Sequence, residues 1–507
     1  MSLLGIDAGT TGCKAAVFSV EGAPLASAYA EYDYGSPQPG WAELDTERVW
    51  RAVKGAVARA AGSVRGDPVS ALAVSSMGEA MVPVTRDRRI LGPSILNFDS
   101  RGAEYLRELR EKLPPERLYP INGNTLGNQY GLTKLMWLRD HRPELYERAD
   151  LFLNWAGFIA FMLGAEPAVD YSLANRSLLF DLSASDWSGE LLQASGLDRQ
   201  KLPRPVPSGE VLGRLDARVA AELSLGPGTA IVAGAHDQCA NCVGCGVTRE
   251  GQAMFGMGTY LCIVPVFGRR PEPVRMLELG LNTEHHAVPG RFVSFLYNMG
   301  GAIVKWFRDT FAAEEHRQAA ARGEEVYDRL FAELPEGASD VLVLPHFSPM
   351  GPPDFIENSS GVLAGLTLQT RRGELLKGIL QGALFALKEC VDLLPRAGLK
   401  VSSYRVVGGG SRSEAWVQLG ADILGQPFVR PKVLEAGALG AAVIAGAGTG
   451  VFSSIEEGSR CMVSLARSFE PDPRRGAEYA ERYARYLRLW PLLKDCLLYT
   501  SPSPRDS

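Results

Sequence analysis

The stretch LLGIDAGTTGCK, residues 3–14, decides the fold. An apolar run ends at Asp7, a turn rich in glycine and threonine follows, and apolar character resumes from Lys14 to Val20. This pattern predicts a strand, a tight turn and a second strand. The stretch is therefore not a Walker loop, because a Walker loop leads from a strand into a helix.

The same kind of organisation extends outward from this stretch. Helical periodicity places Val49, Val53 and Val57 on one face of a helix. Further strands are expected at residues 25–32, 69–75, 229–233 and 404–407, a strand–turn–strand unit at 252–265, and further helices at 374–394 and 477–493. Strands and helices that alternate in this way predict an α/β protein.

The length of the chain predicts more than one domain. With 507 residues it exceeds the size at which a single hydrophobic core stops growing. We expect an N-terminal domain at residues 1–245 and a C-terminal domain at residues 246–490. Residues 491–507 are expected to be a disordered or non-native tail without function, because periodicity is lost from about Asp495.

Composition excludes several classes of partner. The formal charge of −5 argues against nucleic acid and anionic membranes, which require a basic face. The glycine- and alanine-rich run 437–451 is too short to span a bilayer and predicts a buried helix. The first residues show no export signal, so we expect a cytoplasmic protein whose eight cysteines are reduced thiols.

The turn that follows the first strand has the composition of a phosphate-binding loop. Glycines let backbone N–H groups approach phosphate oxygens, and the hydroxyls of Thr10 and Thr11 add donors. Lys14 adds a positive charge, and Asp7 can hold Mg²⁺ through water. The alternative interpretation is a polar hairpin turn without a ligand.

Three other strand ends carry similar chemistry. Gly258 and Thr259 form a second candidate phosphate loop, which together with the first would clamp a triphosphate between domains. The glycine run 408–410 allows close approach of adenine or ribose, although it also suits a flexible turn. Asp237 precedes a predicted helix, where capping alone would explain it.

In order and spacing, these segments resemble the FGGY carbohydrate kinases, which include xylulokinases and glycerol kinases, across roughly residues 1 to 490. The matching segments are residues 7–11 and 256–259 for the phosphate loops, 234–238 for the catalytic base, and 300–309, 361–381 and 408–427 for the nucleotide side. The likeness departs at Gly378, where the family usually carries alanine or serine.

The resemblance implies a fold and a mechanism. The fold would be two actin-like (ribonuclease H-like) α/β domains with an ATP and sugar cleft between them, in a chain that can form a homodimer. Asp237 would accept the proton of a sugar or polyol hydroxyl that attacks the γ-phosphate of MgATP, and Asp7 and Asp237 would lie at the metal. The implied nucleotide-binding residues are Asp7, Thr10, Thr11, Lys14, Gly258, Thr259, Gly301, Gly409, Gly410 and Ser413.

The segments that the resemblance implies for binding the acceptor sugar match the family's motifs less closely. Glycerol kinases carry Arg-Glu where this chain has Gly78-Glu79, and the segment 97–101 lacks the tryptophan that commonly begins it. Carboxylates and amides suit a polyhydroxylated ligand, because one side chain can bind adjacent hydroxyls. The implied substrate-binding residues are Gly78, Glu79, Asp99, Arg101, Asp237 and Gln238. A pentulose such as xylulose is the favoured acceptor.

Two alternatives keep the actin-like fold but change the function. One is a redox activator that couples ATP hydrolysis to a cysteine-bound cluster, and the other is a chaperone-like ATPase or binding module without a sugar site. The thiols of Cys239, Cys242 and Cys245 would line one side of a helix, which cannot enclose a metal ion, so we interpret them as packing residues. His285 and His286 point to opposite faces of a strand and are candidates only for a pocket wall.

Overall fold

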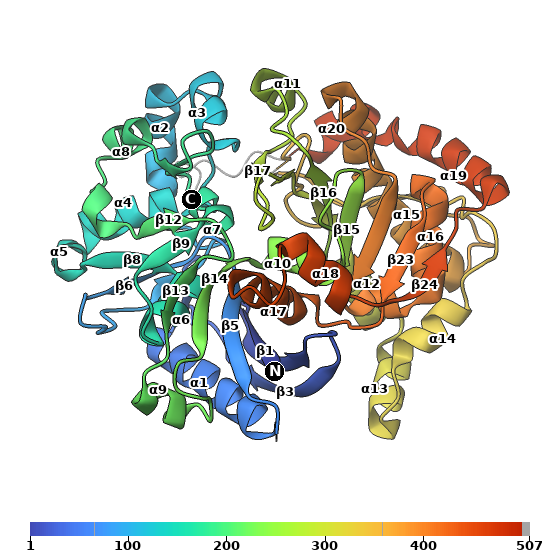
Figure 1. The fold of residues 1–507 in the computed structure, drawn as a ribbon. Helices are drawn as coiled ribbons and strands as arrows, with labels where there is room; N and C mark the ends of the chain where they lie inside the picture. Colours follow the sequence, from blue (N-terminus) through green and yellow to red (C-terminus); the bar gives the residue numbers. More distant parts are fainter. Residues whose placement is uncertain (65, 357, 499–507) are drawn as a thin grey trace.

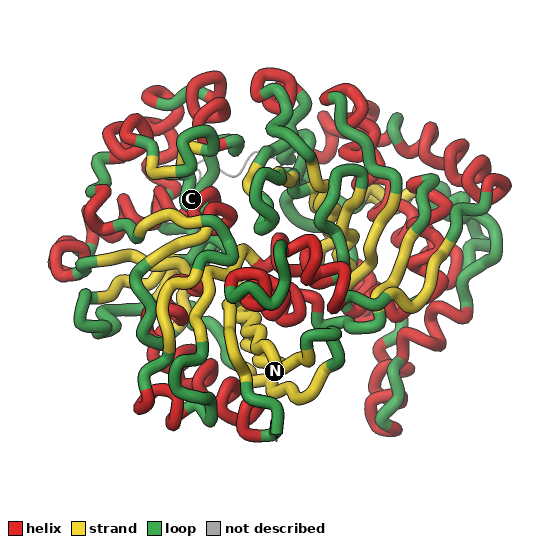
Figure 2. The backbone as a smooth tube through the Cα atoms, viewed as in Figure 1, coloured by secondary structure: helices red, strands yellow, loops and turns green. Residues whose placement is uncertain are grey.

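Two β-sheets flanked by helices form the framework of the molecule (Figure 1). The computed structural model describes residues 1–507 with the exception of 65, 357 and 499–507. Strands and helices alternate along most of the chain (Figure 2), which confirms the predicted α/β class. Among the described residues, no helix is long and apolar enough to cross a lipid bilayer.

The first sheet takes its strands from the first half of the chain, in the order β13-β14-β5-β1-β2-β3. Their bounds are β1 Ser2–Ala8, β2 Gly12–Ser19, β3 Pro24–Glu31, β5 Val69–Ser76, β13 Val211–Arg214 and β14 Ala230–His236. β1, β5 and β14 are parallel, and Asp7 pairs with Ser75 while Ser76 pairs with His236. The carboxyl ends of these strands therefore meet at one edge of the sheet. β1 and β2 form the predicted strand–turn–strand unit.

The side chains of β1 alternate between two hydrophobic layers. Leu4 and Ile6 join the layer that contains α1 and α6, whereas Leu3 joins the layer that contains α10 and α17. These helices are α1 Thr46–Gly62, α6 Trp155–Met162, α10 Asp237–Gly244 and α17 Ala436–Gly448. Both faces of the sheet are thus covered, which explains why its parallel strands are apolar on both sides.

Helix α17 comes from far along the chain and packs on β1, β5 and α10 of the first half (Figure 1). A Cβ atom at Gly5 would overlap the carbonyl oxygen of Ala438, and one at Gly440 would overlap that of Ala240. Small residues at these positions therefore let the backbones touch. The predicted buried helix at residues 437–451 is confirmed, and it anchors the second half of the chain to the first sheet.

The second sheet has the order β17-β18-β16-β15-β22-β23-β24, and β19 pairs with β16. The bounds are β15 Gln252–Met257, β16 Tyr260–Phe267, β17 Glu284–His285, β18 Phe292–Val293, β19 Leu296–Met299, β22 Ser403–Val407, β23 Phe428–Pro431 and β24 Leu465–Phe469. β15 and β22 are parallel, with Gly256 opposite Val407. The turn after β15 and the glycine run after β22 consequently lie at the same edge. The flanking helices are α12 Gly301–Phe311, α15 Arg372–Leu393 and α16 Glu414–Leu424.

Shorter elements complete both halves. The strands are β4 Glu43–Leu44, β6 Met81–Val84, β7 Ser94–Ile95, β8 Leu151–Asn154, β9 Ala168–Asp170, β10 Phe180–Asp181, β11 Asp186–Trp187, β12 Arg204–Val206, β20 Leu342–Leu344 and β21 Val362–Ala364. The helices are α2 Leu106–Lys112, α3 Pro115–Asn122, α4 Gly131–His141, α5 Pro143–Arg148, α7 Tyr171–Asn175, α8 Gly189–Ser195, α9 Ala217–Glu222, α11 Pro273–Glu278, α13 Ala313–Arg322, α14 Val326–Ala332 and α18 Ile455–Met462. Among these, α7 packs against β17 and so joins the two halves beside the carboxyl end of β14.

The C-terminal region differs from its prediction. The single helix expected at residues 477–493 is two helices, α19 Pro473–Tyr486 and α20 Leu489–Leu497. Apolar residues of α20 pack against the second core, so helical structure continues into the segment expected to be a disordered tail. The remainder of that predicted tail, residues 499–507, lies outside the described residues.

Candidate active site

Three acidic side chains gather at the carboxyl edge of the first sheet. Asp7 is near the end of β1, Glu79 follows β5, and Asp237 follows β14. The charges of Asp7 and Glu79 both raise the pKa of Asp237, so each of these two carboxyl groups lies near that of Asp237. The parallel register of the strands thus brings together three of the predicted site residues.

Asp237 is the first residue of α10 and is 29% exposed. Burial raises its pKa to about 7, with further contributions from the charges of Asp7 and Glu79, whereas hydrogen bonds from Gln238 oppose the shift. The N-cap of α10 is His236, whose side chain makes no capping bond, so helix capping does not explain the carboxylate. Nε2 of His236 lies 3.0 Å from Oδ1 of Asp237. Burial and the charge of Arg176 hold the pKa of His236 well below its usual value, which keeps the imidazole neutral.

Asp7 is held from two directions. The hydroxyl of Ser75 donates a hydrogen bond of 2.7 Å to Oδ1, and the carboxylate packs on Gly437 at the start of α17. Burial raises the pKa of Asp7 despite the Ser75 hydrogen bond. Lys14 forms an ion pair with Glu435, immediately before α17. The predicted phosphate-binding lysine therefore already has a partner in the second half of the chain.

Glu79 and Gly78 lie against a buried arginine that sequence reasoning missed. Arg176, at the end of α7, forms ion pairs with Glu79 and with Glu284 of β17. A Cβ atom at Gly78 would stand 3.1 Å from both Cγ of Arg176 and Nε2 of His236, so this glycine permits the close packing. Nothing in the sequence around Arg176 or Glu284 marked either residue, since each partner is about a hundred residues away.

Asp99 and Arg101 contact each other in a separate buried cluster. The guanidinium of Arg101 donates to both carboxylate oxygens of Asp99 and, at 3.0 Å, to Glu43. Arg101 also stacks over the ring of Trp41, with 4.0 Å from Cζ to the centroid. The ammonium of Lys134 donates to the backbone carbonyls of Asp99 and Arg101. Within the described residues, the contacts of this pair are with the cluster itself rather than with Glu79 or Asp237.

The first glycine–threonine turn is a tight, partly exposed hairpin. The N–H of Gly9 donates to the carbonyl of Gly12 at 2.9 Å, and the hydroxyl of Tyr32 donates to the carbonyl of Gly9 at 2.7 Å. Thr10 is half-buried and Thr11 is exposed. The turn is therefore rigid at its base and open at its tip, beside Asp7.

The second glycine–threonine turn is tied to the start of α12. The N–H of Gly301 donates to the carbonyl of Gly258 at 3.0 Å, and that of Ala302 donates to the carbonyl of Thr259 at the same distance. A Cβ atom at Gly301 would overlap the Gly258 carbonyl, so glycine is required for this contact. The structure therefore brings the predicted residues Gly258, Thr259 and Gly301 together.

The glycine run after β22 lies beside the second turn. Gly408 has a φ of 88° and packs against the carbonyl of Met257, as does Gly410. A Cβ atom at Gly409 would meet no atom within 4 Å, so its surroundings are open. Ser413 caps α16 by accepting from the N–H of Trp416 at 3.3 Å.

The cysteines and histidines that the sequence singled out are packing residues. Cys239, Cys242 and Cys245 are buried in the apolar layer between α10 and α17. His285 packs against the rings of Phe180 and Phe292. Neither group contributes a charge to the acidic edge, because burial lowers the pKa of His285 to about 4.

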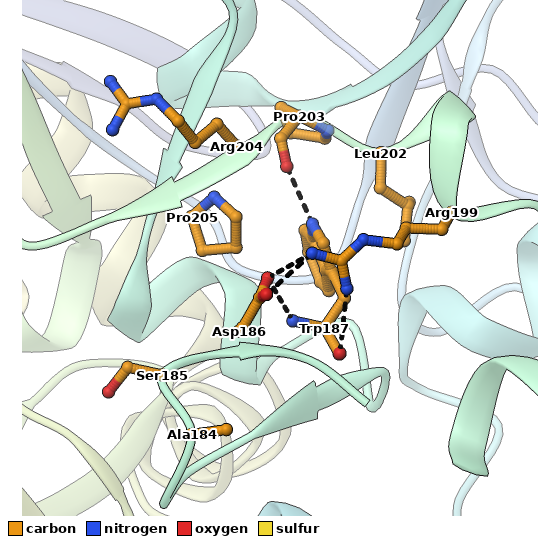
Figure 3. A pocket seen from close by; sticks show the side chains of 9 residues that line it. All are labelled: Ala184, Ser185, Asp186, Trp187, Arg199, Leu202, Pro203, Arg204 and Pro205. Atoms are coloured by element: carbon orange, nitrogen blue, oxygen red, sulfur yellow. Dashed lines mark hydrogen bonds and ion pairs between the residues drawn. The ribbon is translucent and has the colours of Figure 1, made fainter. Parts of the chain in front are cut away.

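A large open cavity of 530 Å³ lies away from these residues, between β11 and β12 (Figure 3). Figure 3 shows the guanidinium of Arg199 against the carboxylate of Asp186, with N–O distances of 2.9 and 2.7 Å. The indole of Trp187 donates to the carbonyl of Pro203 at 2.7 Å. Since these polar groups satisfy one another, the cavity is a weaker candidate than the acidic edge.

Both halves of the chain match models of one protein family. Residues 2–244 match the FGGY family of carbohydrate kinases, N-terminal domain, and residues 262–449 match the C-terminal domain. An autoinducer-2 kinase of Salmonella paratyphi B is 30% identical over 504 residues, covering 94% of this chain and 92% of its own. A xylulose kinase of Escherichia coli is 29% identical over 492 residues, covering 96% and 98%.

Solved structures show the same fold. The crystal structure of xylulose kinase from Rhodospirillum rubrum superposes with a TM-score of 0.87 at 26% identity, covering 98% of this chain and 99% of that one. The two-domain, actin-like fold expected from the sequence is thereby confirmed. The chain belongs to the FGGY family of carbohydrate kinases.

Proposed function

We propose that this carbohydrate kinase transfers the γ-phosphate of ATP to a hydroxyl of a pentulose-like sugar, with Asp237 as the general base. The observation that carries the proposal is the position of Asp237 at the strand edge, where burial, Asp7 and Glu79 raise its pKa to about 7. A carboxyl group with that pKa exchanges protons readily near neutral pH, as a general base must.

The proposed step needs one proton acceptor. The acceptor hydroxyl attacks the γ-phosphorus, its proton passes to a carboxylate oxygen of Asp237, and ADP leaves with the electrons of the broken bond. The imidazole of His236 lies 3.0 Å from Oδ1 and is neutral, so it would not compete with Asp237 for the proton. Glu79 would accept a hydrogen bond from a second hydroxyl of the sugar.

We place the phosphates of ATP between the two glycine–threonine turns. Thr10 and Thr11 offer hydroxyl and backbone donors beside Asp7, and Gly258 and Thr259 are exposed in the facing half. Gly301, which contacts the second turn, would lie near the phosphates. The adenosine would lie on the open side of Gly409, near Gly410 and Ser413, because a Cβ atom at Gly409 would meet no described atom within 4 Å. Turn backbones of this kind are common phosphate sites.

The donor set fits a divalent cation. The charge of Asp7 raises the pKa of Asp237, and a cation bound between the two carboxylates would offset this repulsion. Within the described ranges, no group of three or more His, Cys, Asp or Glu side chains is arranged to hold a metal ion. Mg²⁺ would therefore share its ligands between these carboxylates and the phosphates, and it would neutralise phosphate charge.

The names of the relatives leave the acceptor open. They include autoinducer-2 kinases, a xylulose kinase and an L-xylulose/3-keto-L-gulonate kinase of Escherichia coli, at 28–30% identity. Xylulose kinases also recur among solved structures. We favour a pentulose because it supplies adjacent hydroxyls for Glu79 and Asp237.

A coupled assay for ADP tests the proposal. The purified protein would be incubated with MgATP and one member of a panel of pentuloses, hexuloses and polyols. We expect one pentulose to stimulate ADP formation well above the rate without acceptor, and mass spectrometry to detect its phosphate ester. Equal ADP formation with and without every acceptor would refute the proposal and favour an ATPase without a sugar site.

A further inference from the structure

Arg176 is the charged centre of the acceptor side. Its Nε donates to Oε1 of Glu79 at 2.9 Å, and its Nη1 donates to Oε1 of Glu284 at 2.6 Å. Aromatic rings enclose the guanidinium, with Cζ 5.1 Å from the centroid of Tyr130 and 5.6 Å from that of Phe295. Burial alone would lower the pKa of Arg176, but the two carboxylates outweigh it and keep the arginine charged. The hydrogen bonds and rings thus hold the guanidinium in place, and the two carboxylates neutralise its charge.

The two carboxylate oxygens of Glu284 differ in their hydrogen bonds. Oε1 accepts from Arg176 and from Nδ2 of Asn282, which is 3.0 Å away. Oε2 is buried without a hydrogen-bond partner among the described residues. Asn282 also donates to Asn124, which accepts a bond from the hydroxyl of Tyr130. Because the side chain of Glu284 is fully buried, it does not contact a ligand directly, and its role lies in holding the guanidinium of Arg176.

The balance of charge on this side is negative. Glu79, Glu284 and Asp237 face one permanent cation, Arg176, because His236 is neutral. Lys14, the nearest other cation to Asp7, is paired with Glu435. A sugar carboxylate placed here would face acidic groups and would find the guanidinium already occupied, so it would bind less well than an uncharged sugar.

We infer that Glu284 is a specificity-determining positioning residue, which occupies the guanidinium of Arg176 and thereby excludes sugar acids. This inference rests on the proposed function, because it assumes that the acceptor lies beside Glu79 and Asp237. Glu284 lies on β17, in the second half of the chain, and acts through its ion pair with Arg176 at the end of α7.

Matched acceptors test the inference. Xylulose, xylitol and xylonate each have five carbons, and fructose, glucitol and gluconate each have six. Within each set only the acid, xylonate or gluconate, carries a charge, at its terminal carboxylate. With the wild-type protein we expect kcat/KM to be at least about 100-fold higher for the best neutral acceptor than for the acid of the same length. In Glu284→Gln we expect that ratio to fall by about 10-fold or more, because Arg176 becomes free to bind a carboxylate.

The ratio of kcat/KM for the neutral acceptor to kcat/KM for the acid is measured within one preparation. A partial loss of folded protein lowers both values equally and leaves the ratio unchanged. The matched control is Glu210→Gln, which removes the partner of Arg204 at the surface and should leave the ratio unchanged. If Glu284→Gln does not fold, Glu79→Gln frees the same guanidinium and should shift the ratio in the same direction. Isothermal titration with xylitol and xylonate repeats the comparison without turnover.

The outcomes separate the two proposals. Absence of acceptor-stimulated ADP formation would refute the proposed function, while titration still reports whether neutral ligands are preferred. Stimulation by xylonate or gluconate equal to that by the neutral sugars would overturn the role of Glu284 and leave the kinase reaction standing. An unchanged ratio in both glutamate variants would also overturn it.

Discussion

The two sides of the candidate active site are built in different ways. On the nucleotide side, backbone groups and glycines meet: the carbonyls of Gly258 and Thr259 bind the first N–H groups of α12, and Gly410 packs on Met257. On the acceptor side, long charged side chains meet, with Arg176 between Glu79 and Glu284. Both sets of contacts are made by the tertiary fold, but glycine-rich turns can be recognised in a sequence, whereas the partners of an ion pair cannot.

This difference suggests separate roles for the two sides under the proposed function: one binds ATP, and the other selects the acceptor. A triphosphate is common to many kinases, so a glycine–threonine turn that presents N–H groups serves any of them. An acceptor differs between relatives, and side-chain charges can be exchanged without altering the strands that carry them. Under the proposed function, changes of side-chain charge around Arg176 would alter the choice of acceptor without altering the glycine–threonine turns.

The largest expected effect comes from Asp237→Asn. The amide cannot accept the proton, so kcat should fall by about 10³-fold or more while the Kd for ATP changes little. Stopped coupled assays and ATP titration measure the two quantities. Because burial beside Asp7 and Glu79 opposes the charged form, the melting temperature at pH 8 should not fall. Retained turnover would remove Asp237 from its role.

The next largest effect is expected from Arg176→Met. Glu79 and Glu284 would remain buried without their cation, and losing one partner of a buried pair costs about 3–5 kcal/mol of unfolding free energy. Urea denaturation followed by circular dichroism measures this loss. The double variant with Glu284→Gln should recover part of it. A change below about 1 kcal/mol would show that the network contributes little to the fold.

Elements that depend mainly on their own residues were predicted correctly. The turn at residues 8–12 follows from its own glycines and threonines, and α17 follows from a run of glycine and alanine. Arg176 and Glu284 could not be found in this way, since neither has a motif and their partners are distant in the chain. The length of the C-terminal helix was misjudged for a related reason: α20 is stabilised by packing on the second core rather than by its own periodicity.

The pH dependence sharpens the assignment of the base. Only the deprotonated form of Asp237 accepts a proton, so kcat/KM for the acceptor should decrease as pH falls through about 7 and level off above about 8. Initial rates between pH 5.5 and 9 would measure the profile, with MgATP saturating. A carboxylate at its ordinary pKa would give a flat profile over this range and would contradict the acidic cluster.

A smaller effect, confined to the nucleotide side, is expected from Gly301→Ala. The added Cβ would overlap the carbonyl of Gly258 and displace the second turn. We expect KM for ATP to rise by about 10-fold while KM for the acceptor stays within about twofold. Gly189→Ala, at a position where a Cβ meets nothing within 4 Å and φ is not positive, controls for the substitution itself. Equal changes in both constants would mean that the two sides are not separable.

The smallest effect is expected from Lys14→Met. The ion pair with Glu435 is partly exposed, since the two side chains are 25% and 50% accessible, and such pairs contribute about 0–1 kcal/mol to unfolding free energy. Stability should therefore change little, whereas KM for ATP should rise by a few fold, because Lys14 lies beside the first turn and Asp7. Glu435→Gln breaks the same pair but leaves the lysine free for phosphate. We expect it to leave KM for ATP unchanged or lower, and a rise in both variants would mean that the ion pair, rather than the lysine charge, shapes the nucleotide side.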